Sequence, residues 1–307
     1  MVFTCIKDTS HSFICKTHLQ KNIEQVDCQT VIILNGHNVM TIKKKKNVCS
    51  FLKMKQNGEK IVAVTAYDAP TAKLANDAGV DLLLIGDSMA MTVLGYENTL
   101  PLTMDESLHH CKAARRGAPD AFIVGDMPFM SYQISCSEAL RNAGRYIKEA
   151  NCNAVKLEGG TYAVAVVERL VAAGIPVVGH IGLLPQQVLA AGGYKIAGKT
   201  PEGAEKLLAD AKALEEAGAF CVVLEGIPSK VSKQISESIN IPTIGIGAGI
   251  HCDGQIQVMN DLLGLFSEFV PKHAKRYANL AQTIHDALSQ YSKETRNSEF
   301  PTKENSF

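Results

Sequence analysis

Short apolar runs alternate with stretches of helical periodicity along the chain from about residue 60 onward. The runs are a few residues long and rich in β-branched side chains, which is typical of strands buried on both faces. Several of the helical stretches end at a glycine, as helices commonly do. The pattern predicts strands at 61–65, 81–85, 121–124, 153–156, 176–178, 220–224, 242–246 and, less apolar than the others, 266–270. It predicts helices at 69–78, 104–116, 135–150, 162–173, 201–217, 229–238, 254–263 and 272–291.

Strands and helices that alternate in this way require a parallel sheet with helical crossovers. About eight such units in about 230 residues fit a closed (β/α)8 barrel better than an open doubly wound sheet. We therefore predict an α/β protein with a (β/α)8 catalytic barrel over residues 50–291. The polar residues 292–307 are expected to form a C-terminal tail.

Residues 1–49 differ from the rest of the chain. They have no convincing period, carry four of the nine cysteines and end near a run of four lysines, 43–46. A secretory signal would need a positive start and an apolar centre, and a transit peptide would be rich in arginine and poor in acids. This segment has no arginine and contains Asp8, Glu24 and Asp27. We expect a disordered N-terminal extension rather than a targeting device.

The composition excludes several classes of function. The 31 basic and 31 acidic residues give a formal net charge of zero, which removes the electrostatic footprint of a nucleic-acid binder. No apolar run approaches the length of a membrane span. The nine cysteines contain no Cys-x-x-Cys pair, so we expect reduced thiols in a cytoplasmic protein rather than a zinc site or a disulfide framework.

Two strands end in the same way, in a glycine followed by an aspartate. Ile85-Gly86 leads into Asp87, and Val124-Gly125 leads into Asp126. The carboxyl ends of barrel strands meet on one face, where the active site of such a barrel lies. Neither aspartate precedes an obvious helix, since 88–101 has the composition of a long loop. We therefore expect the two carboxylates to hold a hard cation between them. Asp68, in contrast, precedes Ala69-Pro70 and is expected to cap a helix.

Other strand ends add further polar groups. We expect Lys156 to hold an anionic substrate, with a structural ion pair as the alternative. Glu158 is expected to be a third oxygen ligand or a water anchor. A substrate hydrogen bond is expected of His180, for which a satisfied buried histidine is the alternative, and Glu225 is the candidate general base. The glycine-rich residues 245–249 could cradle a phosphate or simply allow close backbone contacts.

Motifs at these positions together resemble the ketopantoate hydroxymethyltransferase family, from about residue 50 to the tail. The motifs are Thr65-Ala66-Tyr67-Asp68, Gly86-Asp87-Ser88, Gly95-Tyr96, Thr99-Leu100-Pro101, residues 115–119, Asp126-Met127-Pro128, Lys156-Leu157-Glu158, Gly179-His180-Ile181-Gly182, Pro185-Gln186, residues 192–195, Leu224-Glu225, residues 244–249 and Asp253-Gly254-Gln255. One departure is Asn305, which stands where histidine is common in the family.

The resemblance implies a barrel of the phosphoenolpyruvate/pyruvate-binding type that acts in pantothenate biosynthesis. It implies transfer of a hydroxymethyl group from 5,10-methylenetetrahydrofolate to 3-methyl-2-oxobutanoate, giving 2-dehydropantoate through an enolate stabilised by one Mg²⁺ per subunit. It further implies a homo-oligomer, typically a decamer. The residue roles carried over are metal binding by Asp87, Asp126 and Glu158, keto-acid binding by Asp87, Ser88, Asp126 and Lys156, with His180 near the reacting end, and proton abstraction by Glu225.

Two other readings of the residues remain open. A lyase or mutase of the related phosphoenolpyruvate/pyruvate barrels would use the same metal-bound enolate without folate. A barrel kept only as an oligomeric scaffold would not need acids at its strand ends. Product formation that depends on folate separates the first of these from the transferase.

Overall fold

The computed structural model describes the backbone of residues 30–35, 38–43, 45–265 and 271–307, and the side chains from residue 45 onward with the same gap. The chain divides into two compact units, Met1–Lys45 and Lys46–Phe307. In the smaller unit β1 (Thr30–Asn35) and β2 (Asn38–Lys43) pair as an antiparallel hairpin. Residues 1–29 lie outside the described residues, and the expectation of a disordered extension over 1–49 stays a prediction.

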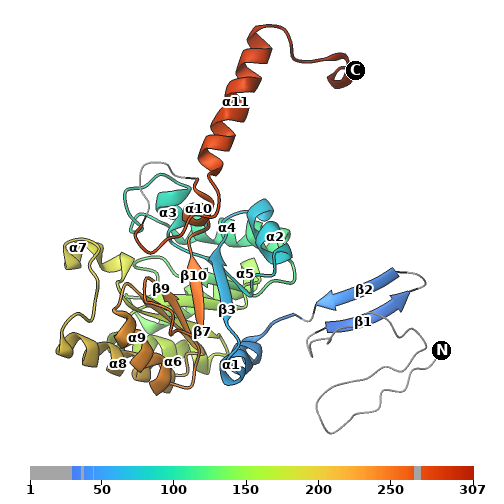
Figure 1. The fold of residues 1–307 in the computed structure, drawn as a ribbon. Coiled ribbons are helices and arrows are strands. Elements are labelled where there is room, and N and C mark those ends of the chain that lie inside the picture. Colours follow the sequence, from blue (N-terminus) through green and yellow to red (C-terminus); the bar gives the residue numbers. More distant parts are fainter. Residues whose placement is uncertain (1–29, 36–37, 44, 266–270) are drawn as a thin grey trace. The chain divides into compact units, whose positions relative to one another are not determined.

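The larger unit is a closed barrel of parallel strands, which confirms the predicted fold class (Figure 1). Each strand pairs with its neighbours in chain order, and the last pairs with the first. The strands are β3 (Ile61–Thr65), β4 (Leu82–Ile85), β5 (Ile123–Asp126), β6 (Ala154–Glu158), β7 (Val177–Gly182), β8 (Cys221–Glu225), β9 (Thr243–Ile246) and β10 (Gly254–Gln257).

Helices follow the strands along the chain, and α1, α2, α4, α5 and α8 begin at a capping side chain. The Thr103 hydroxyl and the Glu106 carboxylate form a reciprocal capping box at the start of α4, and Asp68 caps α2 as expected. The longer helices are α1 (Val48–Asn57), α2 (Ala69–Asp77), α4 (Met104–Gly117), α5 (Cys136–Ala150), α6 (Val164–Ala172), α8 (Pro201–Glu216), α9 (Ser229–Ser238) and α11 (Leu280–Arg296). The shorter ones are α3 (Met89–Thr92), α7 (Val188–Ala191) and α10 (Met259–Leu263), with 3₁₀ turns η1 (Thr161–Ala163), η2 (Pro185–Gln187) and η3 (Lys303–Asn305).

The strand that closes the barrel is not the one we predicted. We expected a helix over 254–263 and the eighth strand at 266–270, which lies outside the described residues. Instead Gly254–Gln257 pairs with β3 on one side and β9 on the other, and α10 follows it. Only Ile256 of this strand is apolar. Gly254 is required because a Cβ there would lie 2.5 Å from the Ile61 carbonyl oxygen.

Two helix predictions also need correction. The segment after Ser88 begins with the short helix α3 instead of a loop throughout. The final helix begins at Leu280, not near residue 272. The Tyr277 N–H donates back to the Leu262 carbonyl (2.8 Å) and the Ala281 N–H donates to the Gly264 carbonyl (3.0 Å), so the approach to α11 bonds to the α10 region rather than along a helix.

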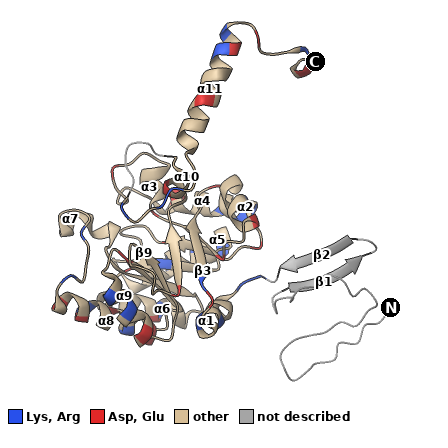
Figure 2. Cartoon of the chain, in the orientation of Figure 1, with Lys and Arg blue, Asp and Glu red and all other residues tan. Residues whose placement is uncertain are grey.

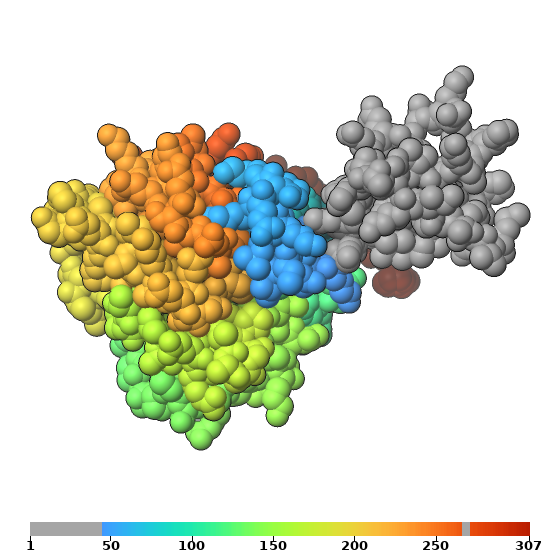
Figure 3. Space-filling model, turned by 90° about the horizontal axis from the view of Figure 1, so that it is seen from below, coloured from blue at the N-terminus to red at the C-terminus, as the bar shows by residue number. Residues whose placement is uncertain are grey.

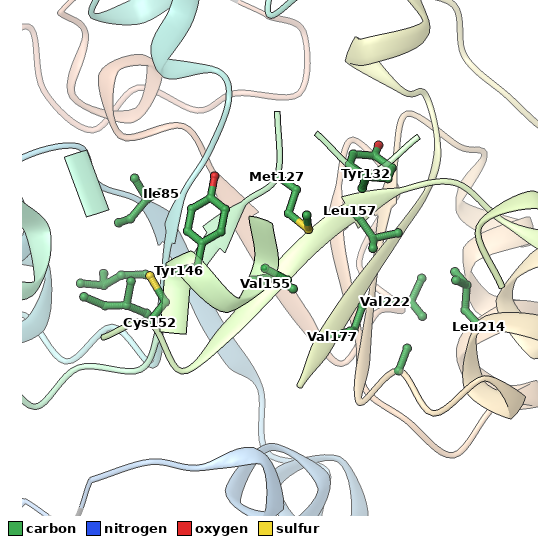
Figure 4. Packing of buried hydrophobic residues seen from close by; sticks show 14 of the residues in the cluster. Ile85, Met127, Tyr132, Tyr146, Cys152, Val155, Leu157, Val177, Leu214 and Val222 are labelled. Carbon is green, nitrogen blue, oxygen red and sulfur yellow. The ribbon is translucent and has the colours of Figure 1, made fainter. Parts of the chain in front are cut away.

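Buried apolar residues form two clusters, as expected when strand side chains alternate between the faces of a barrel sheet. One cluster contains inward residues such as Leu84, Val124 and Ile256, and the other includes residues between sheet and helices. Figure 4 shows part of the second, where Tyr146 of α5 lies near Val155 of β6. Seen from below, the first part of the barrel (blue) adjoins its last part (orange), in agreement with the β3–β10 pairing (Figure 3).

Charged residues of both signs are interspersed over the helices in the view of Figure 2. Within the described ranges, none of the helices combines the length and the apolar character that crossing a bilayer demands.

Candidate active site

The residues selected from the sequence meet at the carboxyl ends of strands β4 to β8. A cavity of about 410 Å³ opens there. Its lining includes six of the seven, namely Asp87, Ser88, Asp126, Lys156, His180 and Glu225. The seventh, Glu158, is buried and its carboxylate oxygen Oε1 lies 3.7 Å from His180 Nδ1. The geometry therefore brings all seven into one site.

Asp87 and Asp126 are in direct contact. The backbone N–H of Asp87 donates to Asp126 Oδ2 at 2.8 Å, and both residues are buried. Asp126 is the last residue of β5, whereas Asp87 follows β4 by two residues. The Asp87 side chain does not cap the short helix α3, because Ser88 holds the cap position and makes no capping bond. Two buried carboxylates are thus left facing one small volume.

Lys156 holds its charge next to these acids. Its Nζ lies 2.9 Å from Asp126 Oδ1. Burial alone would lower the pKa of Lys156, but the charges of Asp126, Asp87 and Glu158 outweigh burial and raise it above its ordinary value. Burial, with the nearby charge of Asp87, raises the pKa of Asp126 to about 7, although Lys156 opposes this shift. The Lys156 ammonium and the Asp87 and Asp126 carboxylates therefore lie together in the cavity lining, and we call these three residues the cavity floor.

His180 links Lys156 to Glu225. Lys156 Nζ lies 3.2 Å from His180 Nδ1, and His180 Nε2 lies 3.2 Å from Glu225 Oε2. Burial and the neighbouring lysine lower the pKa of His180, which favours the neutral ring. Because an ammonium can only donate, Nδ1 must accept and the ring hydrogen must sit on Nε2, which lies near Glu225 Oε2 but makes no hydrogen bond among the described residues. The neutral histidine therefore lies between the Lys156 ammonium and the Glu225 carboxylate at the cavity wall.

Glu158 is as deeply buried as Asp126 but is not part of the cavity lining. Its Oε2 accepts the backbone N–H of Gln186 at 3.1 Å. Its Oε1 is buried without a hydrogen-bond partner among the described residues. Burial raises the pKa of Glu158 well above its ordinary value. A buried carboxylate oxygen without a partner is costly, and it suits a position where a further donor or cation binds.

The donor set fits a magnesium ion. In the described part of the chain, no group of three or more His, Cys, Asp and Glu side chains has the arrangement of a complete metal site. Mg²⁺, however, is commonly bound through one or two carboxylates and completes its shell with water and substrate oxygens. Asp87 and Asp126 can supply such a pair, and the unpartnered Glu158 oxygen can receive a hydrogen bond from a water molecule of that shell.

The sequence profile of the family described as ketopantoate hydroxymethyltransferase matches residues 45–303. The chain belongs to the ketopantoate hydroxymethyltransferase family. It is therefore an enzyme, a hydroxymethyltransferase. A relative from Thermotoga neapolitana is 56% identical over 83% of this chain and 94% of its own length. Another, from Carboxydothermus hydrogenoformans, is 54% identical over 85% of this chain and 94% of its own. Both are named 3-methyl-2-oxobutanoate hydroxymethyltransferase.

Solved structures of other enzymes share the fold of this ketopantoate hydroxymethyltransferase family member. Phosphonopyruvate hydrolase in complex with oxalate and Mg²⁺ aligns with a TM-score of 0.55 at 13% identity, over 84% of this chain and 92% of its own. A 2,3-dimethylmalate lyase of the PEP mutase/isocitrate lyase superfamily aligns with a TM-score of 0.54 at 16% identity, over the same shares. They have the same overall fold as this chain.

Sequence reasoning missed two residues of the site. Gln186 of η2 donates its side-chain N–H to Asp87 Oδ2 at 3.0 Å, and Tyr132 contacts both Gln186 and Glu158. Pro185-Gln186 appeared only as a motif of the resemblance. The one available signal was a glutamine placed just after a barrel strand, which carries no charge to suggest chemistry.

The glycine-rich residues 245–249 are explained by packing. A Cβ on Gly249 would lie 2.2 Å from the Ser229 hydroxyl oxygen, and one on Gly245 would lie 2.8 Å from Cys252 Sγ. Gly247 and Gly249 also adopt positive φ angles, which favour glycine. The contacts account for these glycines without a bound phosphate.

Proposed function

We propose that the enzyme transfers a hydroxymethyl group from 5,10-methylenetetrahydrofolate to 3-methyl-2-oxobutanoate, giving 2-dehydropantoate for pantothenate biosynthesis. The names of its relatives support the acceptor, since these are 3-methyl-2-oxobutanoate hydroxymethyltransferases. The observation that carries the proposal is the contact between Asp87 and Asp126 on a cavity floor that also holds Lys156.

The cavity floor is suited to a small 2-oxo acid. Asp87 and Asp126 would hold one Mg²⁺ per subunit, with Glu158 as the third acid of the site. The Lys156 ammonium would attract the substrate carboxylate, because its positive charge lies in a site from which bulk water is largely excluded. Ser88, whose hydroxyl oxygen lies 2.9 Å from the Tyr67 hydroxyl, would donate a further hydrogen bond to the keto acid.

Glu225 would accept the proton from C3 of the bound keto acid. The residue lines the cavity, and its Oε2 lies 3.2 Å from His180 Nε2, so the carboxylate is within reach of a substrate bound there. Loss of the proton leaves an enolate, whose charge a bound Mg²⁺ would stabilise as a Lewis acid. Carbon–carbon bond formation then requires the one-carbon unit of the folate to lie on the same face of the enolate.

The test is an activity assay with and without Mg²⁺ and with and without methylenetetrahydrofolate. We expect 2-dehydropantoate only when both are present. Product without folate would favour a lyase or mutase of the phosphoenolpyruvate/pyruvate type instead. We also propose that the enzyme is a cytoplasmic homo-oligomer, for which a decamer is expected by light scattering.

A further inference from the structure

Gln186 donates hydrogen bonds to two of the acids of the site, Asp87 and Glu158. Its side chain is almost fully buried, and its Nε2 donates to Asp87 Oδ2 at 3.0 Å and to the Met127 carbonyl at 2.9 Å. Its backbone N–H donates to Glu158 Oε2 at 3.1 Å. One residue therefore fixes one oxygen on each of two carboxylates that come from different strands.

The orientation of the Gln186 amide is determined by its neighbours. Its Oε1 accepts from the Tyr132 hydroxyl at 2.8 Å and from Gln133 Nε2 at 3.2 Å. The Met127 carbonyl can only accept, so the amide nitrogen must lie on the side of Asp87 and Met127. Both hydrogens and both lone pairs of the amide are then used. A buried polar network in which every member is satisfied is rigid.

A closely packed turn after β7 places Gln186 at this position. Gly182 has φ of +105°, and a Cβ there would lie 2.1 Å from the Glu225 carbonyl oxygen. The Leu183 N–H donates to that carbonyl at 2.8 Å, and Pro185 then opens the turn η2 that ends at Gln187. The turn is thus anchored to the strand that carries the proposed general base.

We propose that Gln186 is a positioning residue, which orients the Asp87 and Glu158 carboxylates so that their remaining oxygens face the divalent cation. The inference rests on the proposed metal site. Each carboxylate keeps one oxygen on Gln186, and the second oxygen of Glu158, Oε1, has no hydrogen-bond partner among the described residues. Outer groups that hold metal ligands in place commonly contribute about 10–100-fold in metal affinity.

The experiment is Mg²⁺ titration calorimetry on the full chain, together with initial rates over a range of keto-acid concentrations. The Gln186→Met variant keeps the side-chain volume and removes the two bonds donated by the amide, to Asp87 and to the Met127 carbonyl, while the backbone bond to Glu158 remains. We expect its Mg²⁺ dissociation constant to rise about 10–100-fold while the protein stays folded by circular dichroism. The Tyr132→Phe variant removes one of the two donors that orient the amide, together with the acceptor of the Glu158 N–H, and leaves the amide in place, so its dissociation constant should rise less.

Gln187→Leu is the matched control. Gln187 is the next residue of the same turn, but its amide contacts the Tyr162 hydroxyl and not a carboxylate of the site. Its Mg²⁺ affinity should equal that of the wild type. A folded Gln186→Met variant that binds Mg²⁺ within about twofold of wild type would overturn the positioning role. Absence of Mg²⁺ binding by the wild type would instead reject the metal site proposed above.

Discussion

The two ends of the barrel are built from the same strands yet have opposite characters. At the amino end, Phe51 of α1 packs against Phe122 and Phe220, with ring centroids 4.7 and 6.2 Å away. At the carboxyl end, the strands deliver acids, a lysine and a histidine into the cavity. Strand β6 shows the same contrast on its own. Its first residue, Ala154, belongs to the apolar cluster inside the barrel, whereas Lys156 and Glu158, two and four residues later, are charged.

The contrast indicates that residues at the apolar end mainly stabilise the fold, whereas residues at the charged end carry out the reaction, although both belong to the same short strands. The aromatic end excludes water by apolar contacts, which need no particular charge arrangement. The acidic end keeps charges buried, which is costly unless each is paired or binds a ligand. Changes at one end should therefore affect catalysis, and changes at the other should affect mainly the free energy of unfolding.

The largest effect is expected for Asp87→Asn combined with Asp126→Asn. Both proposed metal ligands then lose their charge, and metal stabilisation of the enolate, which is worth several kcal/mol, should disappear. We expect kcat/KM to fall by about 10³-fold or more, and the remaining activity to be independent of Mg²⁺. Steady-state rates with and without the ion test this. A fully active double variant would refute the ligand assignment.

Glu225→Gln should give the next largest effect. The amide keeps the shape of the side chain but cannot accept a proton, so the rate should fall about 10²–10⁴-fold. Exchange of the C3 proton of 3-methyl-2-oxobutanoate into deuterated water, followed by NMR, should stop, while Mg²⁺ and keto acid still bind. Normal exchange in this variant would remove Glu225 from the role of proton acceptor.

Acid pH should weaken Mg²⁺ binding. Burial and the charge of Asp87 raise the pKa of Asp126 to about 7, so below that pH this carboxyl is protonated before the ion binds. The ion must displace that proton, and its affinity should fall about tenfold per pH unit below 7 and level off above it. Calorimetry in buffers of different ionisation enthalpy checks this through proton release. An affinity that is constant from about pH 5 to 8 would contradict it.

Phe51→Ala should leave the chemistry almost unchanged. The phenyl ring is 1% exposed at the end of the barrel opposite the cavity. Its loss should lower the free energy of unfolding by about 3–5 kcal/mol, measured by urea denaturation. Below the unfolding transition kcat should stay within about twofold of wild type. A large loss of kcat in the folded variant would show that the two ends are coupled.

The smallest effect is expected for Asp68→Ala. The Asp68 carboxylate accepts the Thr71 N–H at 2.7 Å and caps α2, although it also follows a barrel strand. The free energy of unfolding should fall by about 1 kcal/mol, and kcat/KM should not change. A loss of activity as large as that of the other strand-end acids would mean that Asp68 belongs to the active site.

Most of the barrel could be predicted from the sequence because seven of its strands are mainly apolar runs, and several of the helices between them begin at a capping side chain. The eighth, β10, could not, since Gln255 and Gln257 flank its one apolar residue. Its identity as a strand depends on pairing with Ile61–Val64, about 190 residues earlier. Contacts between residues so distant leave no local periodicity.

The charged members of the site could be predicted because an acid or lysine at the end of a buried strand is unusual without a role. Gln186 and Tyr132 could not. Their importance lies in hydrogen bonds to Asp87 and Glu158, which depend on the turn after β7 and on a loop that precedes α5. An uncharged amide in a turn has no feature that separates it from Gln187 beside it.

The central claim is that carboxylates from two different strands hold one divalent ion together with the keto acid. Crystals grown with Mn²⁺ and 3-methyl-2-oxobutanoate, measured at the manganese absorption edge, test it directly. We expect one anomalous peak per subunit, with oxygens of Asp87 and Asp126 within about 2.3 Å and the keto acid beside it. A peak bound elsewhere, or a keto acid bound away from these aspartates, would contradict the account.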